Sequence, residues 1–117
     1  MDITIKRIYE EPGPDDGMRV LVDRLWPRGV SKPRAALDLW DKDVAPSPGL
    51  RTWWEHDPDT FDEFASRYRA ELDAGSAPAD LLDKAKGHDR LTLLYAAHDP
   101  AVNHALVLQE YLRALET

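Results

Sequence analysis

Two mostly apolar runs stand out in the hydrophobic pattern of the chain, one within residues 18–24 and the other at residues 91–97. Apolar runs of this length, bounded by turn residues, are typical of strands that are covered on both faces of a sheet. Residues 3–8 alternate apolar and polar positions, which predicts a half-buried strand at a sheet edge. A shorter alternation at residues 37–40 predicts one further short strand.

The clearest helical period covers residues 61–72, where the apolar side chains fall on one face of a helix. Asp57 and Pro58 precede this stretch. Because Asp caps helices and Pro favours their first position, the helix is predicted to begin there. A second, shorter helix is predicted at residues 79–86, and Gly87 ends it.

Two further helix starts are predicted from the same kind of signal. Ser47 and Pro48 predict the start of a short helix, with Ser47 as its cap. His98, Asp99 and Pro100 repeat the cap pattern seen before residue 61 and predict the start of the last helix. Four residues give this last helix its apolar face: Ala105, Leu108, Leu112 and Leu115.

This order of elements predicts an α/β fold with one domain over residues 1–117. The two buried strands near 18–24 and 91–97 are separated by a helical crossover, which favours a parallel pair. We therefore expect a small, mostly parallel sheet covered by about four helices, with helices on both faces.

Composition excludes several kinds of protein. The chain has no cysteine, which excludes disulfides, thiolate metal sites and cysteine nucleophiles. It has no run approaching the roughly 20 apolar residues of a membrane span, and its first residues lack the apolar core of a signal peptide. We therefore expect a cytoplasmic protein that does not contact a membrane.

Charge is distributed unevenly along the chain. The net charge is −7, which argues against nucleic-acid binding. Residues 19–51 are nevertheless positive, with seven bases against four acids: Arg19, Arg24, Arg28, Lys32, Arg34, Lys42 and Arg51 against Asp23, Asp38, Asp41 and Asp43. A positive patch on an acidic body suits a small anionic molecule, although a solvated charged face explains it equally well.

The end of the strand at 18–24 is where we expect a binding site, because ligands of open α/β sheets lie past the carboxyl ends of such strands. Arg24 and Arg28 follow that strand, and the first turn of the last helix, with Asn103 and His104, should face them. A helix N-terminus and guanidinium groups both favour an anion. The predicted ligand-binding residues are Arg24, Trp26, Arg28, Lys32, Lys42, Arg51 and Asn103.

His104 is the candidate catalytic residue, since its near-neutral reference pKa suits a general acid or base. Whether the protein is an enzyme stays open, and a structural histidine explains the same position. His98, Asp99 and His104 have no metal-site spacing, and no phosphate-cradling loop or dinucleotide fingerprint is present. No metal ion and no cofactor is predicted.

The main competing explanation is structural. Arg24 and Arg28 could be neutralised by Asp23, Asp41 or Asp43, in which case the loop would be part of the framework. Asp57 and Asp99 are most simply helix caps, and His56 a contact at a helix start.

Four blocks of sequence resemble one known family. They are residues 19–32 (Arg-Val-Leu-Val-Asp-Arg-Leu-Trp-Pro-Arg-Gly-Val-Ser-Lys), residues 40–47, residues 50–72 and residues 92–108. Together they resemble the YeaO-like family of small bacterial proteins of unknown function. The chain departs from the family pattern at Trp54, where a smaller aromatic is common, and at His98, where Lys is common.

This resemblance implies an α/β fold but no established activity, substrate or cofactor. The family pattern includes several polar positions: Arg24, Trp26, Arg28, Lys32, Lys42, Arg51, His56, Asn103 and His104. A variable His98 argues against a catalytic role for that side chain.

Two functions are therefore carried forward. The first is a cationic pocket for a small phosphate- or carboxylate-bearing molecule, with His104 as acid or base if a reaction occurs. The second is a non-enzymatic interaction module in which Trp26, Trp40, Trp53 and Trp54 form a surface for a protein partner or a homo-oligomer, because aromatics are enriched at interfaces.

Overall fold

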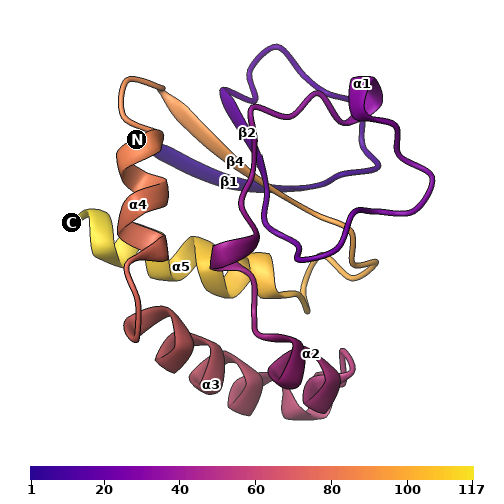
Figure 1. The fold of residues 1–117 in the computed structure, drawn as a ribbon, viewed down its shortest axis with the longest axis vertical. Coiled ribbons are helices and arrows are strands. Elements are labelled where there is room, and N and C mark those ends of the chain that lie inside the picture. Colours follow the sequence, from indigo (N-terminus) through magenta and orange to yellow (C-terminus); the bar gives the residue numbers. More distant parts are fainter.

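Four parallel strands form the sheet in the order β1-β4-β2-β3 (Figure 1). They span Asp2–Arg7 (β1), Met18–Leu21 (β2), Leu39–Trp40 (β3) and Arg90–Tyr95 (β4) in a computed structural model that describes residues 1–117. Leu93 of β4 lies opposite Ile5 of β1 on one side and Val20 of β2 on the other. The predicted parallel pair of buried strands and the α/β class are confirmed.

Helices and 3-10 turns occupy the segments from β2 to β4 and the chain after β4. They are α1 (Lys32–Ala35), η1 (Lys42–Val44), α2 (Pro48–Trp54), η2 (Pro58–Thr60), α3 (Phe61–Asp73), α4 (Ala77–Lys84) and α5 (His104–Glu116). None of the helices combines the length and the apolar content needed to cross a bilayer.

The start of α2 agrees with its prediction, because Ser47 Oγ accepts a hydrogen bond from Leu50 N at 3.1 Å. Asp57 acts as a cap too, but of a 3-10 turn: its carboxylate accepts from Asp59 N at 3.0 Å, and α3 begins only at Phe61.

The predicted start of the last helix at Asp99 is wrong. Asp99 Oδ1 accepts from Ala101 N at 2.8 Å, which closes a local turn. The cap of α5 is Asn103, whose Oδ1 accepts from Leu106 N at 2.9 Å. His104 is therefore the first residue of the helix.

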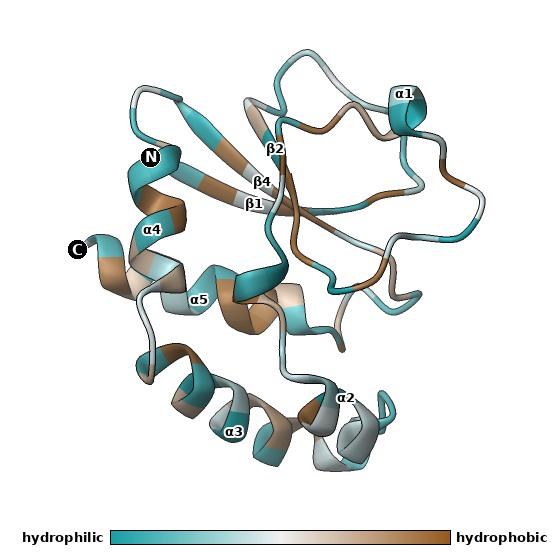
Figure 2. Cartoon of the chain, in the orientation of Figure 1, coloured by the Kyte–Doolittle hydropathy of each residue, from teal (hydrophilic) through white to brown (hydrophobic).

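The larger part of the core lies between the sheet and helices α2 to α5. Val20, Leu91 and Leu93 face it from the strands, and Trp54, Phe64 and Leu108 belong to its helical side. Figure 2 shows the same division, with apolar segments in β2 and β4 and hydrophilic residues in the outer turns of the helices.

The other face of the sheet has a smaller apolar cluster of Ile8, Leu21, Val30, Ala35 and Leu94. Only the single turn of α1 and the loops around it cover this face. We expected helices on both faces of the sheet, but all the longer helices lie on one face. In the connection from β2 to β3, residues 22–38, only the four residues of α1 are helical, and the rest form loops.

A buried ionic cluster fixes the turn that leads into β2. Asp16 accepts hydrogen bonds from Gly13 N at 2.9 Å, from Lys6 Nζ at 3.2 Å and from Arg19 Nη1 at 2.5 Å. Arg19 Nη2 also donates to Ala35 O at 2.7 Å. This cluster joins β1, β2 and α1 and lies away from the carboxyl ends of the strands.

Candidate functional site

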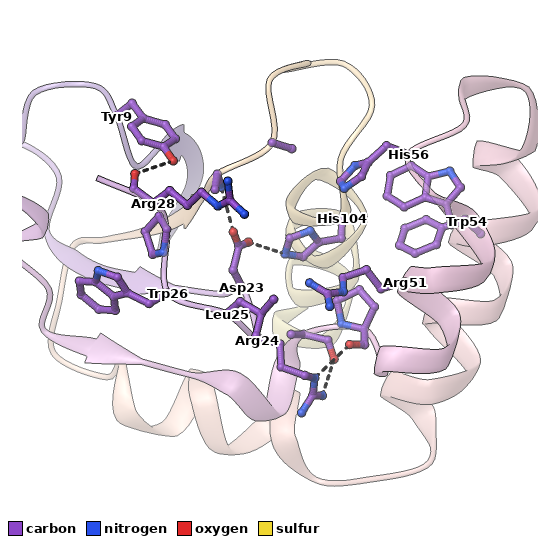
Figure 3. A pocket seen from close by; sticks show the side chains of 16 residues that line it. Tyr9, Asp23, Arg24, Leu25, Trp26, Arg28, Arg51, Trp54, His56 and His104 are labelled. Atoms are coloured by element: carbon purple, nitrogen blue, oxygen red, sulfur yellow. Dashed lines mark hydrogen bonds and ion pairs between the residues drawn. The ribbon is translucent and has the colours of Figure 1, made fainter. Parts of the chain in front are cut away.

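A pocket of about 360 Å³ opens past the carboxyl ends of β2 and β4, a volume within the usual range for small-molecule sites. Most of its lining comes from the loop after β2, from the segment 45–56 that contains α2, and from the chain between β4 and the start of α5. Tyr9, after β1, and Phe64, in α3, complete it. In Figure 3, Asp23 and His104 lie in its centre, between Arg28 and Trp26 on one side and Arg51, Trp54 and His56 on the other.

The loop after β2 is held in place by hydrogen bonds to its own backbone. Trp40 Nε1 donates to Asp23 O at 2.7 Å and Trp26 Nε1 donates to Val30 O at 2.7 Å. The hydroxyl of Tyr9 donates to Arg28 O at 3.1 Å. A loop fixed in this way presents its side chains to the pocket in one arrangement, which favours binding.

Three arginines line the pocket, and none of them lies within ion-pair distance of a carboxylate. Arg24 makes two long contacts, to Pro46 O at 3.3 Å and to Ala45 O at 3.4 Å. The guanidinium groups of Arg28 and Arg51 make no hydrogen bond within the protein.

The carboxylates that were expected to neutralise these arginines are engaged elsewhere. Asp41 caps η1 by accepting from Asp43 N at 3.2 Å, and Asp23 contacts His104. Asp43 forms no ion pair. The pocket therefore contains three guanidinium groups against one lining carboxylate, that of Asp23.

Asp23 and His104 form a close pair in the floor of the pocket. Asp23 Oδ1 lies 3.1 Å from His104 Nε2, and Asp23 Oδ2 accepts from Ala96 N at 3.0 Å. Asp23 Oδ1 is buried and has no hydrogen-bond partner, so its contact with His104 is an ion-pair distance only. The side chain of His104 is only 11% exposed.

The surroundings of His104 determine which ring nitrogen carries a hydrogen. Nε2 lies 3.0 Å from Val22 O and 3.1 Å from Asp23 Oδ1, and both oxygens are hydrogen-bond acceptors. Nε2 must therefore carry the hydrogen. Nδ1 has no partner within the protein, so in the neutral ring it offers a lone pair.

His56 lies beside this pair at the rim of the pocket. Its backbone has a φ of 58°, in the left-handed region that costs energy for residues other than glycine. Its ring packs against that of Trp54, tilted by 40° with the ring centroids 4.8 Å apart. Burial lowers the pKa of His56, the charges of His104 and Arg51 lower it further, and Asp23 opposes the shift.

The structure brings five of the eight predicted site residues together in this pocket: Arg24, Trp26, Arg28, Arg51 and His104. The other three lie outside it. Lys32 is the exposed first residue of α1, and the ammonium of Lys42 lies 4.1 Å from the centre of the Trp40 ring. Asn103 is fully buried, with both polar side-chain atoms bonded within the chain.

Sequence reasoning did not assign Tyr9, Asp23 or His56 to the site. Asp23 was considered only as a partner for the arginines. His56 was interpreted as part of a helix cap, although its recurrence in the family pattern was a usable signal. Tyr9 had no signal, because it comes from the turn after β1 and reaches the pocket only through the fold.

Comparisons with known proteins agree with the resemblance in the sequence. Residues 2–116 match the model of the DUF488-N3i family, described as the inactive DUF488-N3 subclade. The uncharacterized protein YeaO of Escherichia coli is 44% identical, with 98% of this chain and all of that protein covered. The uncharacterized protein Rv3073c of Mycobacterium tuberculosis is 47% identical, with 94% of this chain and 92% of that protein covered. No solved structure matches.

Proposed function

The chain belongs to the YeaO-like family, within the inactive DUF488-N3 subclade, and we propose that it binds a small phosphate- or carboxylate-bearing molecule in the pocket after β2 and β4. The observation that carries this proposal is the set of three arginines, Arg24, Arg28 and Arg51, that line one pocket without a carboxylate partner.

Electrostatics support an anion as the ligand. A guanidinium group that has no partner in the protein can form charge-assisted hydrogen bonds to an oxyanion, each contributing about 1.5–3 kcal/mol. Two or three such bonds suffice for micromolar affinity after the costs of association. The aromatic walls, Trp26 and Trp54, favour a ligand that has an apolar part beside its anionic group.

Binding is preferred to turnover as the function. The subclade is described as inactive, and the pocket supplies positive charge more clearly than a complete set of reacting groups. His104 is the residue that would act as acid or base in any reaction at this site, because its Nδ1 has no partner and its Nε2 is held by Val22 O beside the Asp23 carboxylate.

The alternative of a tryptophan-rich interaction surface has less support. Trp54 is buried, and Trp26 and Trp40 are partly buried, with their indole N–H groups bonded to the loop backbone. Trp53 is the exposed one, at 42%, and the guanidinium of Arg67 lies over its ring. These side chains do not form one continuous apolar patch.

Isothermal titration calorimetry with inorganic phosphate tests the proposal. Because Arg28 has an exposed side chain without internal bonds, Arg28→Ala is expected to leave the fold intact and to weaken binding about tenfold or more. Arg67→Ala is the matched control, since it removes the same charge from α3, outside the pocket. Equal affinity in the wild type and in Arg28→Ala would remove the assignment.

A further inference from the structure

We propose that His104 accepts a phosphoryl group on Nδ1 from a small phosphoryl donor bound in the pocket. The inference rests on the proposed function, since it requires that the pocket binds the phosphoryl oxygens. It goes beyond binding because it assigns a covalent modification to one named atom.

The first argument is the fixed orientation of the ring. Val22 O accepts from Nε2 of His104 at 3.0 Å, and Asp23 Oδ1 lies 3.1 Å from the same nitrogen. The ring is thereby held with its hydrogen on Nε2 and its lone pair on Nδ1. A carboxylate on one ring nitrogen increases the basicity of the other. Asp23 is therefore a positioning residue in this proposal.

The second argument is the lack of another nucleophile. No Ser, Thr, Cys or Lys lines the pocket. The hydroxyl of Tyr9 is engaged with Arg28 O. The Asp23 carboxylate and His56 are the other candidates. Asp23 Oδ2 accepts from Ala96 N, and its Oδ1 faces His104 Nε2. His56 lies at the rim, its residue is exposed, and no carboxylate holds its ring. His104 is more than nine-tenths buried and has an unpartnered nitrogen.

The third argument is the charge around the acceptor atom. His104 is the first residue of α5, a helix of 13 residues, so the positive end of the helix dipole lies at its backbone. Arg24, Arg28 and Arg51 line the same pocket. These groups would neutralise the phosphoryl oxygens both before and after transfer.

The step balances without an oxidant or a metal ion. The Nδ1 lone pair attacks phosphorus, and the Nδ1–P bond forms while the bond from phosphorus to the leaving group breaks. With phosphoramidate as the donor, the P–N bond breaks and ammonia leaves with the hydrogens its nitrogen already carries. Nε2 keeps its hydrogen, and the Asp23 carboxylate stabilises the positive charge that the ring gains.

The test incubates the full chain with phosphoramidate at neutral pH and follows intact mass and the modified residue by tandem mass spectrometry. One phosphoryl group per chain is expected on His104, and the bond should be lost in acid. His104→Gln should abolish it. His88→Gln, at an exposed position outside the pocket, should leave it unchanged.

The role of Asp23 has its own measurement. Asp23→Asn is expected to slow phosphorylation about tenfold or more. It should also shift the ¹⁵N resonance of Nε2 of His104, because this N–H then faces an amide instead of a carboxylate, while Val22 O keeps the hydrogen on Nε2. A merely structural Asp23 would leave the rate of phosphorylation per folded molecule unchanged.

The outcomes separate the two proposals. Binding of inorganic phosphate without phosphorylation of His104 would overturn this inference and leave the proposed function standing. Absence of both would overturn both. Phosphorylation spread over His56 and the exposed histidines would also overturn it. Mapping the site in the wild type gives this answer even if His104→Gln does not fold.

Discussion

The carboxylate of Asp23 lies 3.1 Å from Nε2 of His104 and also accepts the backbone N–H of Ala96. One side chain thus joins the end of β2 to the chain after β4 and to the first turn of α5. The pair occupies the floor of a pocket whose other charged groups are arginines. We therefore expect this pair to stabilise the packing of these three segments and to fix the orientation of the His104 ring in the pocket.

Breaking this pair should destabilise the protein. In Asp23→Asn the amide would meet the N–H on Nε2 of His104, so a donor would face a donor. We expect a loss of about 1–3 kcal/mol in the free energy of unfolding, measured by urea denaturation. Since His104→Gln removes the same contact, the double variant should lose less than the two single losses together. Strictly additive losses would show that the two side chains act independently.

The parallel strands at the centre of the sheet could be predicted from the sequence, because their apolar side chains have to be buried. Val20 and Leu93 lie in apolar runs that only a covered strand can accommodate, and the two residues are opposite each other in neighbouring parallel strands. Ser47 caps α2 as predicted, because its local signal meets no competing contact. The predicted start of α5 was wrong because the Asp99 carboxylate accepts from Ala101 N in a local turn and caps no helix. Asn103, four residues later, is also a residue that favours the cap position, and it caps α5.

The site was only partly predictable, because the sequence shows which side chains are charged but not where each of them points in the fold. Arg24 and Arg28 follow the strand and reach the pocket, whereas Lys42 folds back over Trp40. His56 enters the pocket through a left-handed backbone conformation, which no pattern of hydrophobic residues reports. Tertiary contacts between distant segments determine these placements.

Stability should fall in acid through Asp16. Burial favours the neutral acid, but hydrogen bonds from Gly13 N, Lys6 and Arg19 hold the pKa of Asp16 below its ordinary value of 3.8. A carboxylate whose pKa is lower in the folded state stabilises that state above the ordinary pKa. This contribution is lost as the pH falls through the folded-state pKa.

Urea denaturation between pH 2 and 7 measures this contribution, with Asp16→Asn as the comparison. The variant should be less stable at neutral pH by about 3–5 kcal/mol, because it leaves the buried Arg19 without its anion. The difference between the two proteins should shrink as the pH falls below about 4. A difference that stays constant with pH would contradict this explanation.

Asp41 should behave in the opposite way. Burial raises its pKa above the ordinary value of 3.8, and the hydrogen bond from Asp43 N and the charge of Lys84 offset this only in part. An acid whose pKa is higher in the folded state reduces stability at neutral pH, and this cost disappears as the pH falls.

Asp41→Asn is therefore expected to stabilise the protein at pH 7 by about 1 kcal/mol or less. Asn keeps an acceptor for Asp43 N and caps as well as Asp. Thermal unfolding at pH 7 and at pH 3 measures the gain, which should be absent at the lower pH. A loss of stability at pH 7 would mean that the charge of Asp41 is needed in the fold.

The location of anion binding is tested most directly by an NMR titration of the ¹⁵N-labelled protein with inorganic phosphate. We expect saturable shifts confined to the amides that surround the pocket, those of residues 23–26, 28, 96–97 and 104–105, and we expect Arg28→Ala to weaken them. Titration with sodium chloride at equal ionic strength controls for screening. Shifts that do not saturate, or that spread over the exposed lysines and arginines of the rest of the chain, would contradict a built anion site between β2, β4 and α5.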